Sequence, residues 1–195
     1  MSRLVALAAL ALVACAPSIA PEAELDAAPG DAGPTGPVVT TVAPDGTATT
    51  RIDATDAEAW IYVDLDTGTA TTIDGAWELA AQRFHLMIDG GVSGDGGVEV
   101  APVAGDLTTL TAAPSTGWLT DADDGDDPDA LPDYAFEQGD GWYSYDPATH
   151  VLTPRPLVWA IRATTGGPWA LVIDRYYDDA GSSGVFTVRW RPLGG

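Results

Sequence analysis

The densest group of side chains that could do chemistry is a run of carboxylates in the second half of the chain. Nine acidic residues and no basic residue occur in residues 121–140. Carboxylates this close together repel one another unless water solvates them, salt screens them or a hard cation bridges them.

The calcium-ligand candidates in this run are Asp121, Asp123, Asp124, Asp126, Asp127 and Asp129. The run fails the EF-hand pattern, because Thr120 stands at the first position when Gly125 is placed at the sixth. Two interpretations remain open, a weak calcium loop of the extracellular type and a solvated acidic loop.

Nothing in the sequence is typical of catalysis. Ser93 lies in a glycine-rich stretch, but the Gly-x-Ser-x-Gly spacing fails at Asp95. The same stretch lacks the helix and the lysine that a phosphate-binding loop would need. We therefore predict a binding protein and not an enzyme.

The N-terminus has the pattern of a lipoprotein signal peptide. Arg3 is followed by eleven apolar residues from Leu4 to Ala14, too few to cross about 30 Å of hydrocarbon as a helix. The run ends in Leu-Val-Ala-Cys and so resembles a bacterial lipobox, with Cys15 as the acylated residue and the only cysteine of the chain. An ordinary signal peptide with an incidental cysteine is the alternative. Ala16 follows the cysteine, and the absence of Asp there is typical of lipoproteins sorted to the outer membrane.

The composition excludes several classes of protein. The 195 residues carry a net charge of −21, so nucleic acid and anionic lipid headgroups would be repelled. The lipid anchor is then the only membrane contact that we expect. A single cysteine excludes an internal disulfide and a cysteine-rich zinc site. Hydrophobic residues make up 46% of the chain and include seven Trp, which predicts a folded core.

The chain divides into three parts by composition. Residues 1–14 form the signal peptide, and residues 15–47 form the lipidated cysteine with a flexible Pro/Ala/Gly-rich linker. The stretch Val38 to Val42 is the exception, because it could pair as an early strand. Residues 48–195 form one globular domain.

The domain is predicted to be all-β, an antiparallel meander or sandwich. Residues 59–65 and 70–73 are β-strand-like and flank a turn, which indicates a hairpin. Residues 157–162, 169–173 and 186–190 alternate in hydrophobicity and are separated by turn residues. Residues 77–89 are ambiguous, because their apolar side chains fit both helical and strand spacing.

Several of these segments, in order, resemble the HmuY family of bacterial outer-membrane lipoproteins. They are residues 59–68, 77–80, 84–97, 142–145, 149–154, 159–164, 174–177 and 186–190. Glu78 and Asp89 stand where the family pattern has Asp and Asn. The resemblance implies an all-β fold, strand structure over residues 77–89, and capture of haem or a related porphyrin for an outer-membrane receptor or transporter that takes up iron.

Haem iron takes His, Met, Cys or Tyr as axial ligand, and this leaves His85, His150, Met87 and the six Tyr in the chain. The ligand candidates are His85, His150 and Met87. On a strand, His85 and Met87 would share one face. The alternative for His85 is a surface position on a solvated strand. The alternative for His150 is a hydrogen bond to the turn formed by residues 146–149, which precede it. The ligand pairs of the family's characterised haem binders lie outside the matched segments, so they do not carry over to this chain.

Five aromatic residues could pack against a porphyrin face, although a core position is the commoner fate of such residues. They are Trp142, Tyr143, Tyr145, Tyr176 and Tyr177. The alternative function is a surface lipoprotein that binds no haem and uses the acidic run 121–140 to bind calcium or a protein.

Overall fold

The computed structural model describes residues 36–123 and 131–194. The signal peptide, Cys15 and the calcium candidates Asp124, Asp126, Asp127 and Asp129 lie outside these ranges. The strands are β1 Val38–Val42, β2 Ala48–Asp53, β3 Ile61–Asp64, β4 Thr69–Thr71, β5 Leu79–Gln82, β6 His85–Ile88, β7 Glu99–Ala104, β8 Tyr143–Asp146, β9 Val151–Pro154, β10 Leu157–Arg162, β11 Trp169–Tyr177 and β12 Ser183–Pro192. No helix that could cross a membrane occurs within the described ranges.

A six-stranded antiparallel sheet is the larger layer, with the strand order β1-β2-β12-β11-β10-β7. Its centre is the predicted C-terminal meander, and the neighbours β10, β11 and β12 confirm that prediction. The alternation in β12 explains the pairing, because Phe186 and Val188 are fully buried while Thr187 and Arg189 are not. Strand β1 pairs with β2, which confirms that Val38 to Val42 pair as an early strand, so the sheet includes residues ahead of residue 48.

The second layer is a four-stranded sheet with the order β4-β3-β5-β6. The predicted hairpin over residues 59–73 is confirmed as β3 and β4, with Gly68 in the left-handed region that their turn requires. Residues 77–89 are strand, as the resemblance implied, but they form two strands instead of one. Arg83 and Phe84 make the tight turn between them, and Arg83 has a φ of 51°.

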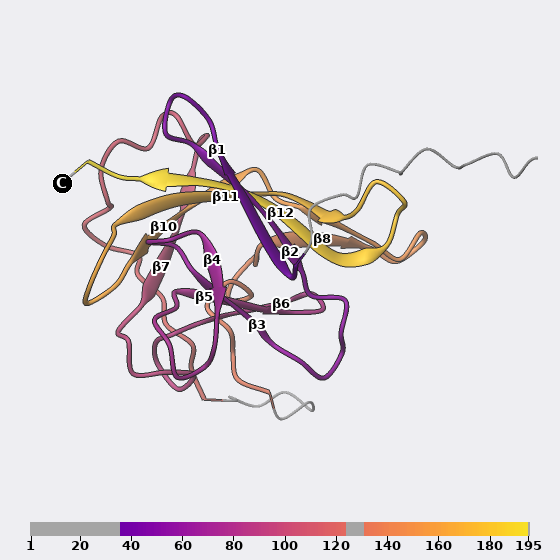
Figure 1. Cartoon of the computed structure of the whole chain (residues 1–195). Helices are drawn as coiled ribbons and strands as arrows, with labels where there is room; N and C mark the ends of the chain where they lie inside the picture. The colour runs from indigo at the N-terminus through magenta and orange to yellow at the C-terminus, as the bar shows by residue number, and fades with distance from the viewer. Residues whose placement is uncertain (1–35, 124–130, 195) are drawn as a thin grey trace, which may run out of the picture. The chain divides into compact units, whose positions relative to one another are not determined.

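One hydrophobic core fills the space between the two sheets. It contains Ile52 and Phe186 of the larger sheet and Leu79 and Leu86 of the smaller one, all fully buried. Figure 1 shows β3, β5 and β6 on one side of β2, β11 and β12, with the β8–β9 hairpin extending beyond them. The hairpin reaches this position because the Leu152 N–H donates to the Tyr177 hydroxyl of β11 at 3.0 Å.

The long connection between β7 and β8 is held to the smaller sheet by Asp121. Its carboxylate is 1% exposed and accepts the N–H groups of Ile88 at 3.0 Å and Ala135 at 2.7 Å. Burial raises the pKa of Asp121 to about 6, which the two hydrogen bonds partly oppose. The Asp121 carbonyl also accepts the Val92 N–H at 3.0 Å. Asp121 therefore ties the connection to Ile88 of β6 and to Val92 in the loop after it, and it also links two parts of the connection through Ala135.

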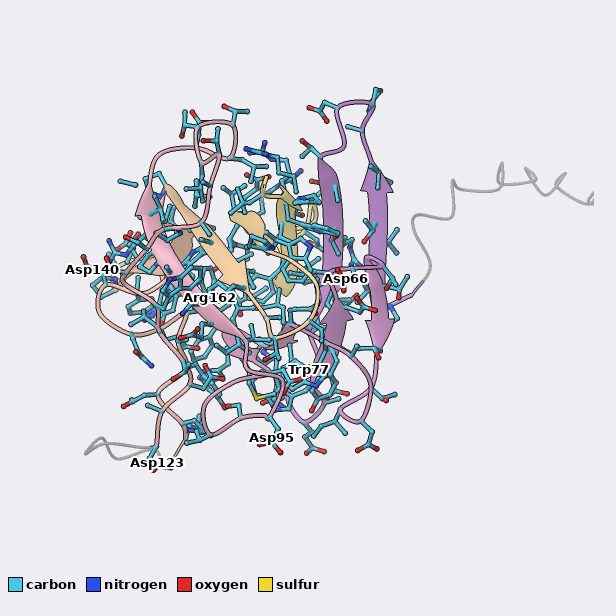
Figure 2. All side chains as sticks on the ribbon, turned by 90° about the vertical axis from the view of Figure 1, so that its left-hand side faces the viewer. Asp66, Trp77, Asp95, Asp123, Asp140 and Arg162 are labelled. Atoms are coloured by element: carbon cyan, nitrogen blue, oxygen red, sulfur yellow. The ribbon has the colours of Figure 1, made fainter. Side chains whose placement is uncertain are left out.

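Asp121 was expected among the calcium candidates, and both of its side-chain oxygens bond to backbone instead. Asp123, by contrast, is exposed on its loop, as are Asp95 and Asp140 elsewhere (Figure 2). The calcium prediction for the remaining acids of the run stays a prediction.

We predict that Asp121→Asn lowers the free energy of unfolding by about 2 kcal/mol. The amide oxygen can accept one of the two buried N–H groups, but the amide nitrogen opposes the other. Urea denaturation measures the change, with Asp123→Asn as the control that removes the same charge from an exposed position. Equal stabilities for the two variants would contradict the role given to Asp121.

Candidate functional site

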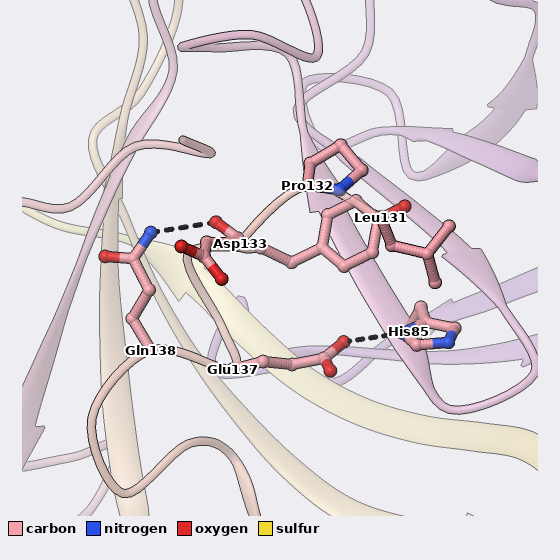
Figure 3. Close-up of a pocket in the computed structure, with 7 residues that line it drawn as sticks. His85, Leu131, Pro132, Asp133, Glu137 and Gln138 are labelled. Carbon is pink, nitrogen blue, oxygen red and sulfur yellow. Dashed lines mark hydrogen bonds and ion pairs between the residues drawn. The ribbon is translucent and has the colours of Figure 1, made fainter. Parts of the chain in front are cut away.

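The two histidines line different pockets. His85, at the start of β6, lies in a small pocket of about 200 Å³ with Tyr134, Glu137 and Gln138 (Figure 3). Its Nδ1 is 3.1 Å from the Glu137 carboxylate, and its ring is 5.4 Å from that of Tyr134. The ring also contacts Phe84 at 4.0 Å between centroids. His85 is thus held by a carboxylate and two aromatic rings in a small, mostly polar pocket.

Met87 does not accompany His85 in this pocket. It is 9% exposed and belongs to an apolar cluster with Trp77, Ala80 and Tyr134, of which Tyr134 also lines the His85 pocket. Trp60 and Tyr62 pack against the same cluster. His85 and Met87 are two residues apart on β6, but Met87 is more buried because the side chains of this cluster cover it.

His150 lines a larger cleft on the other side of Phe84. This cleft has a volume of about 450 Å³, and we call it the aromatic cleft. The residues that line it are Phe84, Tyr143, Tyr145, His150, Leu152, Tyr176, Tyr177 and Ser183. Four of the five aromatic residues expected to pack a planar ligand are therefore in one place, and they come from β8 and β11.

The fifth of those residues, Trp142, forms the base on which the cleft is built. It is 1% exposed, and its ring contacts those of Tyr143, Tyr176 and Phe186 at centroid distances of 4.8, 5.6 and 5.2 Å. Its indole N–H donates to the Phe84 carbonyl at 3.1 Å. Trp142 thereby connects the β5–β6 turn, β11 and β12 beneath the cleft.

The turn of the β8–β9 hairpin positions His150. The residue has a φ of 58°, and its N–H donates to the Asp146 carbonyl at 2.8 Å. The Asp146 carboxylate accepts the Ala148 N–H and the Thr149 hydroxyl, which fixes the rest of the turn. This local bonding agrees with the turn that the sequence indicated at residues 146–150.

The imidazole of His150 is oriented by a tyrosine. Its Nδ1 forms a short hydrogen bond with the Tyr145 hydroxyl. A metal would then bind through Nε2, the arrangement common in metal sites whose other ring nitrogen is hydrogen-bonded. Burial raises the pKa values of Tyr143 and Tyr176, so both phenols stay protonated at neutral pH.

A group of three carboxylates lies elsewhere, at the β3–β4 turn. Oxygen atoms of Asp64, Asp66 and Glu78 lie within 4.8 Å of one another. Glu78 is 5% exposed, and its Oε2 accepts the Leu65 N–H at 2.7 Å. Burial, reinforced by the charges of Asp64, Asp66 and Asp89, raises the pKa of Glu78 to about 7. Sequence reasoning missed this group, because the turn and the glutamate are brought together only by the pairing of β3 with β5.

Comparison with known families identifies the fold. The model of the HmuY protein family matches residues 56–190, more than half of the chain. The chain belongs to the HmuY family. No curated protein matches it significantly.

Solved structures agree with this membership of the HmuY family. A candidate HmuY-like haem-binding protein from Bacteroides vulgatus is 18% identical, with a TM-score of 0.63 over 81% of this chain and 98% of that one. A candidate lipoprotein from Bacteroides fragilis is 19% identical, with a TM-score of 0.61 over 81% and 97%. The apo HmuY analogue of Tannerella forsythia is 14% identical, with a TM-score of 0.58 over 80% and 97%. At these identities the structures establish a shared fold.

The acidic group predicts how the stability of this HmuY-family chain depends on pH. The pKa of Glu78 rises from 4.5 to about 7 on folding, so between these values the folded chain binds a proton that the unfolded chain has released. The contribution of Glu78 to stability is complete below pH 4.5 and is lost as pH rises through 7. We predict that Glu78→Gln raises Tm at pH 8 by about 5 °C and has little effect at pH 4.5.

Differential scanning calorimetry across this pH range measures the difference in Tm. Asp95→Asn is the control, because it removes one negative charge from an exposed loop. A Glu78→Gln difference that stays constant from pH 4.5 to pH 8 would show that Glu78 does not titrate in this window.

Proposed function

We propose that this protein is a lipid-anchored binding protein of the cell envelope that captures haem or a related porphyrin in the aromatic cleft. The observation that carries the proposal is the convergence of four tyrosines, Phe84 and one histidine on a single cleft. Sites for small ligands are typically concave, largely apolar and about 300–1,000 Å³ in volume. The aromatic cleft falls within this range at about 450 Å³, and the His85 pocket falls below it at about 200 Å³.

His150 is the proposed axial ligand. Imidazole binds haem iron, and the hydrogen bond of Nδ1 to Tyr145 would leave Nε2 as the nitrogen that holds the metal. His85 belongs to another pocket and is bonded to Glu137, so we propose one protein ligand and not a pair of histidines. The second axial position would then take water or a side chain of a partner.

The aromatic side chains would bind the porphyrin face. Tyr and Phe provide large apolar surfaces whose offset and edge contacts with another ring are favourable. Tyr145 is 52% exposed, so its ring is accessible to a ligand in the cleft. The described haem-binding relative from Bacteroides vulgatus supports the same ligand class.

The proposed role is capture followed by transfer to an outer-membrane receptor or transporter, without catalysis. A ligand site that is open beside the β8–β9 hairpin suits transfer, because a receptor can reach the bound molecule. Description of the Bacteroides fragilis structure as a candidate lipoprotein agrees with a position outside the cytoplasm.

We predict that the purified full-length chain binds haemin at one-to-one stoichiometry with a shifted Soret band. His150→Ala abolishes the shift or weakens binding at least tenfold, because the axial bond is lost. His85→Ala is the matched control and leaves both the Soret position and the affinity near those of the unsubstituted chain. Absorbance titration in detergent buffer measures all three proteins.

Two results would contradict the proposal. A flat titration of the unsubstituted chain would exclude haem capture. A Soret shift that His85→Ala abolishes and His150→Ala preserves would move the ligand to the His85 pocket.

The anchor is tested separately. Two or three acyl chains on one residue hold a protein firmly in a bilayer, because each buried CH₂ contributes about 0.8 kcal/mol. We predict that Cys15→Ser moves the protein from the membrane fraction to the soluble fraction, measured by immunoblot after ultracentrifugation. Retention of this variant in the membrane would contradict lipidation at Cys15.

A further inference from the structure

Arg83 is fixed in an unusual backbone conformation beside the aromatic cleft. Its φ of 51° lies in the left-handed region, which side chains other than glycine rarely adopt. The segment after β2 fixes this residue from outside the turn, because the Arg83 N–H donates to the Ala54 carbonyl at 2.8 Å. Strained backbone of this kind is concentrated at functional sites in proteins.

The guanidinium of Arg83 has only neutral partners within the described ranges. One nitrogen donates to the Thr55 carbonyl at 2.9 Å, and another donates to the Ser183 hydroxyl at 3.1 Å. Other arginines pair with carboxylates, and these are Arg51, Arg162, Arg175 and Arg189. Within the described ranges, Arg83, Arg155 and Arg191 are the arginines that donate to neutral groups only.

Arg83 contacts the aromatic cleft through its hydrogen bond to Ser183. Ser183 lines the cleft. Arg191 donates to the carbonyls of Leu107 and Leu110, and Arg155 donates to the backbone carbonyls of Asp140 and Tyr143. Within the described ranges, Arg83 is therefore the arginine that bonds a side chain lining the cleft. Tyr176 also lines the cleft, and the charge of Arg83 opposes the rise in the pKa of its phenol. Arg83, Ser183 and Tyr176 therefore lie together at one corner of the cleft.

We infer that this corner binds a carboxylate, and that the aromatic cleft selects planar aromatic molecules that carry one. The inference rests on the proposed function and specifies its ligand class. A guanidinium has five N–H donors, so Arg83 can keep its two bonds and still donate to a carboxylate. The serine hydroxyl can rotate to donate as well. The ring of the ligand then lies among the tyrosines, with the carboxylate on Arg83.

The negative charge of the surface makes the position of Arg83 more important for binding a carboxylate. A carboxylate ligand is repelled by most of a surface with this net charge, and a cation at the cleft that no described carboxylate neutralises gives it a favourable position there. Binding of the carboxylate by Arg83 does not require haem iron. A metal-free porphyrin with free carboxylates should therefore bind, and the same ring with esterified carboxylates should bind more weakly.

Protoporphyrin IX and its dimethyl ester are the probes, titrated against the full-length chain in one detergent and followed by porphyrin fluorescence. We expect the unsubstituted chain to bind the free acid about tenfold more tightly than the ester. Arg83→Gln should lose this preference by weakening only the binding of the acid, and Arg83→Lys should keep part of it. Arg189→Gln removes the same charge from an exposed ion pair with Asp174 and should leave the preference unchanged.

The outcomes separate the two proposals. Porphyrin binding without a preference for the acid, or equal loss of acid and ester binding in Arg83→Gln, would overturn the carboxylate corner and leave porphyrin capture standing. The acid-to-ester comparison on the unsubstituted chain decides this even if the variant fails to fold. No binding of either porphyrin or of haemin would overturn both proposals.

Discussion

The burial of Trp142 is the interaction on which the aromatic cleft depends. Its indole packs against Tyr143, Tyr176 and Phe186, and its N–H satisfies the Phe84 carbonyl at the β5–β6 turn. Three chain segments that are distant in sequence thus meet at one side chain. Because this side chain is almost fully buried, its neighbours have few alternative positions, and a rigid wall of tyrosines follows from ordinary core packing.

Charge has opposite roles at the surface and in the cleft. Exposed acids give the molecule its strongly negative field, which favours solubility and disfavours nucleic acid and anionic membranes. Buried acids have structural uses instead, as Asp121 shows by accepting two backbone N–H groups. Against this background, the neutral partners of Arg83 give the cleft a local preference for an anion that the surface as a whole repels.

Part of this fold could be predicted from the residues. The C-terminal meander was predictable because the alternation of β12 matches the period of a strand that is buried on one face. Residues 77–89 resisted prediction because a tight turn at Arg83 divides them into two short strands, and arginine carries no turn signal. The His150 turn was predictable, since Asp146 and Pro147 are typical turn residues.

By itself, the sequence determined the all-β fold class, the acidic composition, the lipobox-like N-terminus and the resemblance to the HmuY family. These properties depend on residue type and on short-range spacing. Only the tertiary structure decided that His85 and His150 line different pockets, and that Arg83 meets Ser183. Such pairings depend on strand register and on which sheet faces which, and neighbours in space that are distant in sequence leave no local pattern to read.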